Sequence, residues 1–119
     1  MNPAVVGAIL GGLGVTFGAF GAHVLKSKLA VDRLEIFETG VRYQLVHALA
    51  LLAVAALLRQ NPEAAARPTW LFLCGTVVFS GTLYALALGA PKWLGAVTPI
   101  GGLALIGGWV ALAFAVRQG

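Results

Sequence analysis

The chain has 119 residues, of which 60% are hydrophobic and only 10% are charged, whereas about 25% of the residues of a typical soluble domain are charged. Its net charge of +4 comes from scattered basic residues, which argues against a nucleic-acid-binding patch and favours contact with anionic lipid headgroups. The composition therefore indicates one integral membrane domain. Cys74 is the only cysteine, so no intrachain disulfide can form.

Four apolar segments follow one another along the chain. Residues 3–25, 69–91 and 93–116 contain no charged side chain, and each is longer than the roughly 20 residues that cross the hydrocarbon core of a bilayer. Residues 43–58 form a shorter run, so this helix is expected to bring part of the preceding polar segment into the membrane. We predict an all-α bundle of four transmembrane helices in a single domain, with helices at about 3–25, 32–58 with an amphipathic start, 69–90 and 93–116. The first run lacks the basic n-region of a signal peptide and is predicted to be a membrane span.

The connections carry the charges. Asp32 and Glu35 have the spacing of a capping box, which predicts that the second helix begins near Asp32. The five residues GAPKW alone join the third and fourth helices, which predicts a tight antiparallel hairpin. Lysine and arginine are more numerous on the side of the first and third loops (Lys26, Lys28, Arg33, Arg42 and Lys92) than on the other (Arg59, Arg67 and Arg117). The positive-inside rule then places the first and third loops in the cytoplasm of a multi-pass protein of the cell membrane, the inner membrane in a bacterium.

Small residues form a stripe along the first and the fourth helix. Each glycine costs about 1 kcal/mol of helix propensity relative to alanine, and close helix packing is the reason to retain it. We expect the stripe of the first helix to face either the fourth helix or another subunit, so that the protein is a candidate homo-oligomer built on a glycine zipper. The glycines concerned are Gly7, Gly11, Gly14, Gly18 and Gly21 in the first helix and Gly101 and Gly108 in the fourth.

Polar side chains gather in the half of the bilayer next to the first loop. A pore needs polar groups through the full thickness of the membrane, whereas a pocket that opens to one face needs them on one side, so the sequence favours a one-sided polar pocket. Glu38 and Arg42 are expected to neutralise each other, and Tyr43 and His47 form a second pair with the same spacing. The predicted pocket residues are His23, Glu38, Arg42, Tyr43, Gln44, His47, Ser80, Tyr84 and Thr98.

These residues are compatible with several functions. A structural clasp without a ligand is one interpretation, although ionisable groups at membrane depth are functional candidates by default. We predict a non-enzymatic protein that binds a lipid, a quinone-like molecule or a partner helix, and the alternative is a small-solute or proton transporter in which His23, Glu38 and His47 titrate. No Ser/His/Asp spacing indicates catalysis. His23, His47 and Glu38 are metal-ligand types, but they lack the paired spacing of a metal site. We therefore expect no catalytic residue, metal or cofactor.

Four segments also carry a resemblance. FGAFGAHVL, FETGVRYQLVHALALL, FSGTLYALALGA and LGAVTPIGG with the following GGW resemble, in order, the signature segments of the uncharacterised small membrane protein family (domain of unknown function 423) that includes bacterial YgdD-like proteins and eukaryotic transmembrane protein 256. The resemblance implies four membrane helices and lends no activity. The family pattern falls on His23, Glu38, Arg42, Tyr43, Gln44, His47, Ser80, Tyr84, Thr98, Pro99 and Trp109. Gly40 stands where alanine is more usual.

Overall fold

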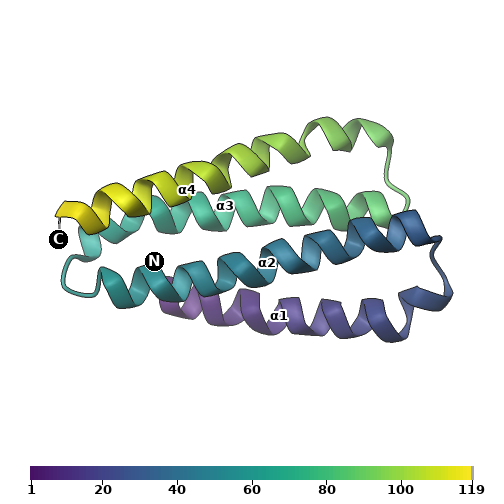
Figure 1. Ribbon diagram of the computed structural model, residues 1–119, viewed down its shortest axis with the longest axis horizontal. Coiled ribbons are helices and arrows are strands. Elements are labelled where there is room, and N and C mark those ends of the chain that lie inside the picture. The colour runs from purple at the N-terminus through teal and green to yellow at the C-terminus, as the bar shows by residue number, and fades with distance from the viewer. Residues whose placement is uncertain (119) are drawn as a thin grey trace.

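The structure, a computed structural model, describes residues 1–118, and helices are the only regular secondary structure in that range (Figure 1). Four of its helices are long and apolar enough to cross a membrane, which confirms the predicted all-α membrane fold. Two short 3₁₀ helices lie in the connections at one end of the molecule. The helices in chain order are α1 (Pro3–His23), η1 (Leu25–Ser27), α2 (Val31–Leu57), α3 (Pro62–Ala87), η2 (Lys92–Ala96) and α4 (Thr98–Gln118).

The long helices pack in the order of the sequence. α1 packs on α2, α2 on α3 and α3 on α4, while α1 has only a minor contact with α3. Figure 1 shows α1 and α4 at opposite edges of the array, whose principal extents are 48 × 27 × 18 Å. Both termini and the connection between α2 and α3 lie at one end, and the other two connections lie at the opposite end. The bundle is therefore an open array with α2 and α3 in its interior.

The second helix begins and ends within one residue of the predicted bounds, but the reason for its start differs. Ala30 is the N-cap residue and no side chain caps the helix, so the predicted capping box of Asp32 and Glu35 is wrong. α2 has 27 residues, more than the roughly 20 that cross the hydrocarbon, and its charged residues lie near its start. The first two turns of α2 therefore extend beyond the hydrocarbon on the side of the first loop.

The third and fourth helices differ more from their predicted bounds. α3 begins seven residues earlier than predicted because the side chain of Asn61 accepts a hydrogen bond from the backbone N–H of Ala64 in its first turn, and Pro62 fits the first helical position. Pro68 is accommodated inside this helix. α4 begins later than predicted, because residues 92–96 form the 3₁₀ helix η2 instead of a first α-helical turn. Pro99 lies in the first turn of α4, where a backbone N–H group would have no acceptor within the helix, so the missing N–H group of proline costs nothing there.

The glycine stripe of α1 packs on α2 of the same chain, so the prediction that it faces the fourth helix is wrong, and the homo-oligomer stays a prediction. Gly7, Gly14 and Gly21 are the buried residues of α1. A Cβ atom added to Gly7 would lie 2.8 Å from the carbonyl oxygen of Ala48, and one added to Gly14 would lie 2.7 Å from Leu45. The glycines of α4 have the same role against α3, because a Cβ on Gly101 would lie 2.5 Å from the backbone nitrogen of Phe79.

Candidate functional site

Gln44 is the centre of a buried polar contact among three helices. Its side chain, only 3% exposed, projects from α2. Its Nε2 donates to the carbonyl oxygen of Leu10 on α1 at 2.9 Å, and its Oε1 accepts from the hydroxyl of Tyr84 on α3 at 2.6 Å. A glutamine amide buried in apolar surroundings needs such partners, because an unpaired polar group there is costly. Both ends of the Gln44 amide are thus satisfied within the protein.

Ser80 and Gly40 form a second link between α2 and α3. The buried hydroxyl of Ser80 donates to the carbonyl oxygen of Gly40 at 2.7 Å. The ring of Tyr84 packs on the same glycine, since a Cβ there would lie 2.7 Å from the ring. The absence of a side chain at Gly40 therefore lets Tyr84 come close to α2, where its hydroxyl reaches Gln44.

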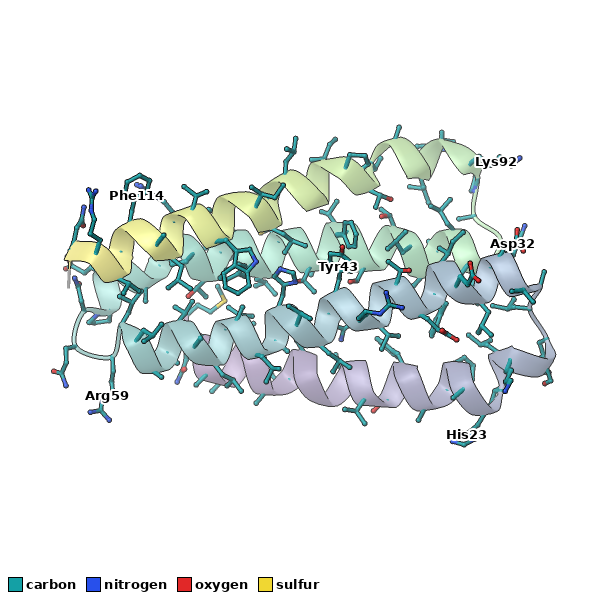
Figure 2. All side chains as sticks on the ribbon, viewed as in Figure 1. His23, Asp32, Tyr43, Arg59, Lys92 and Phe114 are labelled. Carbon is teal, nitrogen blue, oxygen red and sulfur yellow. The ribbon has the colours of Figure 1, made fainter. Side chains whose placement is uncertain are left out.

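His47 links α2 to α4. Its Nδ1 lies 2.7 Å from the carbonyl oxygen of Tyr43, and the indole Nε1 of Trp109 donates to its Nε2 at 3.1 Å. The imidazole also packs against Phe72 of α3, with ring centroids 5.6 Å apart. The ring of Tyr43 stacks on that of His47, with centroids 6.2 Å apart. Figure 2 shows Tyr43 reaching from α2 across α3, where its ring lies 4.6 Å from that of Phe79.

Trp109 is the residue of these contacts that polarity alone did not single out. The sequence does contain a signal for it, because membrane proteins concentrate tryptophan at the two interfaces, whereas Trp109 lies in the middle of the 21-residue α4. A tryptophan at that depth needs an acceptor for its indole N–H. The backbone acceptors at Leu10, Gly40 and Tyr43 have no signal of this kind in the sequence.

Four predicted residues lie apart from these contacts, namely His23, Thr98, Glu38 and Arg42. His23 is exposed at the end of α1 and projects away from the other helices (Figure 2), so its predicted place in the pocket is wrong. Thr98 shares a hydrogen bond of 2.6 Å with the hydroxyl of Thr82. That bond joins α4 to α3 near their connection. His23, Glu38 and His47 are thus not brought together, and the described residues contain no group of three potential ligands that could hold a metal ion.

Glu38 and Arg42 lie on the outside of α2 rather than in a buried pair. Both side chains are exposed, and the structure places no ion pair between them within residues 1–118. The prediction that they neutralise each other by direct contact is therefore wrong. Both residues instead line a groove of about 270 Å³ between α1 and α2, which we call the Arg42 groove. The groove is lined by Gly18, Gly21, Phe37, Glu38, Val41, Arg42 and Leu45.

The Arg42 groove has an apolar floor and a charged rim. Gly18 and Gly21 have no side chains, so the backbone of α1 lines one side of the groove. Val41 and Leu45 of α2 line the other side. If the hydrocarbon ends near Thr39, Arg42 lies three residues, or about 5 Å, inside it. A guanidinium at this depth is costly unless it reaches water or an anion.

A larger groove of about 650 Å³ lies at the other end of the molecule, between the start of α3 and the end of α4. It contains none of the predicted site residues. Much of its lining, including Glu63 and Arg67, belongs to the first turns of α3, which extend beyond the apolar span. It therefore lies at the end of the molecule opposite the first loop, away from the predicted polar pocket.

Comparison with known proteins identifies the family. The chain matches the family described as Protein of unknown function (DUF423) over residues 17–102. It belongs to this family. The match includes every residue of the Arg42 groove, whereas the larger groove draws part of its lining from residues 111–118 beyond it. The family resemblance found in the sequence is thereby confirmed.

The relatives are themselves membrane proteins by name. The chain is 42% identical to the UPF0382 membrane protein YwdK of Bacillus subtilis, over 93% of this chain and 92% of the relative. It is 38% identical to the UPF0382 inner membrane protein YgdD of Escherichia coli, over 91% of this chain and 83% of the relative. No solved structure matches the chain. The protein is accordingly a multi-pass membrane protein of the DUF423 family.

Proposed function

We propose that this protein binds a phospholipid, without catalysis, in the Arg42 groove. The observation that carries the proposal is the position of Arg42, which is exposed at the rim of a groove with an apolar floor. An arginine binds a phosphate through two parallel hydrogen bonds. A phospholipid supplies that phosphate at the membrane surface together with acyl chains that suit the apolar floor. It is the ligand that matches both parts of the groove.

The other ligands considered fit the groove less well. A quinone-like molecule has no phosphate and would leave the Arg42 guanidinium without an anion. A partner helix would have to place an acidic side chain opposite Arg42 and would be recovered as a second protein. A transporter would use His47 as a titrating group, but both ring nitrogens of His47 are engaged by Tyr43 and Trp109. These contacts favour binding over transport.

The proposal is tested by native mass spectrometry of the protein released from mild detergent. We expect the wild-type protein to retain a phospholipid adduct, and Arg42→Gln to lose at least about tenfold of it, since one hydrogen bond to a charged group is worth about 1.5–3 kcal/mol. Arg33→Gln is the matched control, because Arg33 is an exposed arginine of the same helix that does not line the groove. Equal adducts in the two variants, or none in the wild-type protein, would overturn the proposal.

The transport alternative has its own measurement in liposomes. We expect no protein-dependent proton current from the wild-type protein. A pH-dependent current that His47→Ala abolishes would contradict a binding function and would support transport.

A further inference from the structure

Glu38 gives the Arg42 groove a second, opposite charge at a defined position. Both residues are exposed and both line the groove. They are four residues apart on α2, which places them on the same face with an axial separation of about 6 Å. Because the two side chains do not pair with each other within the described residues, each is available to a ligand. A ligand that satisfies both must itself carry a negative and a positive group.

The order of the two charges matches the order of groups in a zwitterionic headgroup. Glu38 lies closer than Arg42 to the first-loop end of α2, and therefore closer to the water. In a phospholipid the phosphate joins the glycerol, and an amine on a two-carbon bridge extends further outward. A phosphate at Arg42 thus directs the amine towards Glu38. The reverse arrangement of charges on α2 would not fit such a headgroup.

The chemistry of the two side chains distinguishes a primary amine from its methylated forms. A carboxylate forms its strongest contacts as charge-assisted hydrogen bonds, and a primary ammonium offers three N–H donors for them. A choline group has no N–H donor, and proteins recognise it with cages of aromatic rings. The groove contains a single aromatic residue, Phe37, so it offers a hydrogen-bond acceptor rather than a cage.

We infer that the Arg42 groove selects a phospholipid whose headgroup carries a phosphate and a primary amine, with Arg42 binding the phosphate and Glu38 the amine. This inference rests on the proposed function, since it specifies the headgroup of the same ligand. The ligand class is an ethanolamine phospholipid, as opposed to a choline or glycerol phospholipid with the same acyl chains.

The test is a competition measured by native mass spectrometry. The detergent-solubilised protein is titrated with an equimolar mixture of phosphatidylethanolamine, phosphatidylcholine and phosphatidylglycerol that share their acyl chains. We expect the ethanolamine adduct to exceed the choline adduct about tenfold, the factor that one charge-assisted hydrogen bond supplies. In a second titration with mono- and dimethylated phosphatidylethanolamine, the adduct should fall stepwise as N–H donors are replaced by methyl groups.

Variants of Arg42 and Glu38 separate the contribution of the phosphate contact from that of the amine contact. Glu38→Gln should reduce the ratio of ethanolamine to choline adduct to about one while keeping the glycerol adduct, and Arg42→Gln should weaken all three. Glu35→Gln is the matched control, an exposed glutamate of the same helix outside the groove, and should keep the wild-type ratio. An unchanged ratio in Glu38→Gln, or equal adducts of all three lipids in the wild-type protein, would overturn the headgroup assignment alone. No adduct with any lipid would overturn the proposed function as well.

Discussion

The histidine in the middle of the membrane has a defined protonation state. A tryptophan indole can only donate a hydrogen bond, so the Nε2 of His47 that receives the Trp109 N–H must carry a lone pair. The proton of the neutral ring then lies on Nδ1 and is donated to the carbonyl oxygen of Tyr43. His47 is therefore a neutral structural link between α2 and α4. A second proton on this ring would face the indole N–H and break that link.

The two tyrosines provide a matched pair of single-atom changes. Tyr84→Phe removes the donor to Gln44 Oε1, which is buried, and we expect it to lower the free energy of unfolding by about 0.6–1.7 kcal/mol, the range for hydrogen bonds between membrane helices. Tyr43→Phe removes a hydroxyl from a ring that is 42% exposed and should change stability by less than about 0.5 kcal/mol. Steric trapping in bicelles measures both values. Equal effects would show that the Gln44 contact contributes nothing to stability.

Individual polar residues could be located by depth from the sequence, but their partners could not. The spacing of Glu38 and Arg42 is compatible with a pair, yet pairing also depends on rotamers, and both side chains lie outside the helix contacts. Gln44 and Tyr84 are separated by 40 positions, so their contact depends on how α2 packs on α3. Backbone acceptors such as the carbonyl of Leu10 carry no signal in the residue type. The sequence therefore predicts which polar groups are available but not the contacts between them.

At the scale of the helices, small residues determine how closely neighbours approach. Gly7→Ala should destabilise the protein by about 1–3 kcal/mol, because its Cβ would meet the backbone carbonyl of Ala48 at 2.8 Å and overpacking of this kind is costly. Gly12→Ala is the control on the same helix. A Cβ at Gly12 has nothing within 4 Å, so this change should be neutral or stabilising by up to about 1 kcal/mol through helix propensity.

The same pair of variants tests where the glycine stripe packs. Because Gly7 faces α2 of its own chain, we expect Gly7→Ala to lower the unfolding temperature without producing a smaller particle in a light-scattering measurement. A folded particle of reduced mass would instead indicate that the stripe joins two subunits. If Gly12→Ala were the more damaging change, the packing of α1 on α2 described above would be wrong.

The bounds of α2 were predictable from the sequence, but those of α3 were not, because charged residues and Pro68 lie inside α3. α2 was placed to within a residue because charged residues frame it. α3 was predicted to start at 69, but helix formation needs only a cap and compatible backbone angles. Asn61 and Pro62 supply both. The apolar segment of α3 is therefore shorter than the helix itself. Hydropathy locates the apolar segment but not the start of the helix.

At the scale of the whole molecule, the five-residue connection predicted that the third and fourth helices are neighbours, but the open arrangement of all four helices had no signal in the sequence. In a membrane protein the lipid-facing and protein-facing sides of a helix are equally apolar, so hydrophobic periodicity does not identify the buried side. α1 is an example, since its buried residues are all glycines while Val5, Ile9 and Val15 are exposed. The number of helices followed from the charge-free segments. Their open arrangement followed only from the three-dimensional structure.

The orientation of the molecule in the membrane is predicted by its lysine and arginine distribution. Both termini lie at one end of the array (Figure 1), and Arg59 lies at that end while Lys92 and Asp32 lie at the other (Figure 2). With Arg42 inside the apolar span, the first-loop end has Lys26, Lys28, Arg33 and Lys92, against Arg59, Arg67 and Arg117. Four against three is a small excess, so the orientation should respond to the loss of one or two lysines.

We predict that the first and third loops face the cytoplasm and that both termini face the opposite side. In a bacterial host, a C-terminal alkaline phosphatase fusion should then be active and a C-terminal green fluorescent protein fusion dark. Lys26→Ala combined with Lys28→Ala leaves two basic residues against three and should shift the fusions towards the inverted orientation, because positively charged loops resist translocation. Arg59→Ala is the control that should strengthen the wild-type orientation. A fluorescent C-terminal fusion of the wild-type protein would contradict the prediction, and it would move the Arg42 groove from the cytoplasmic to the outer leaflet.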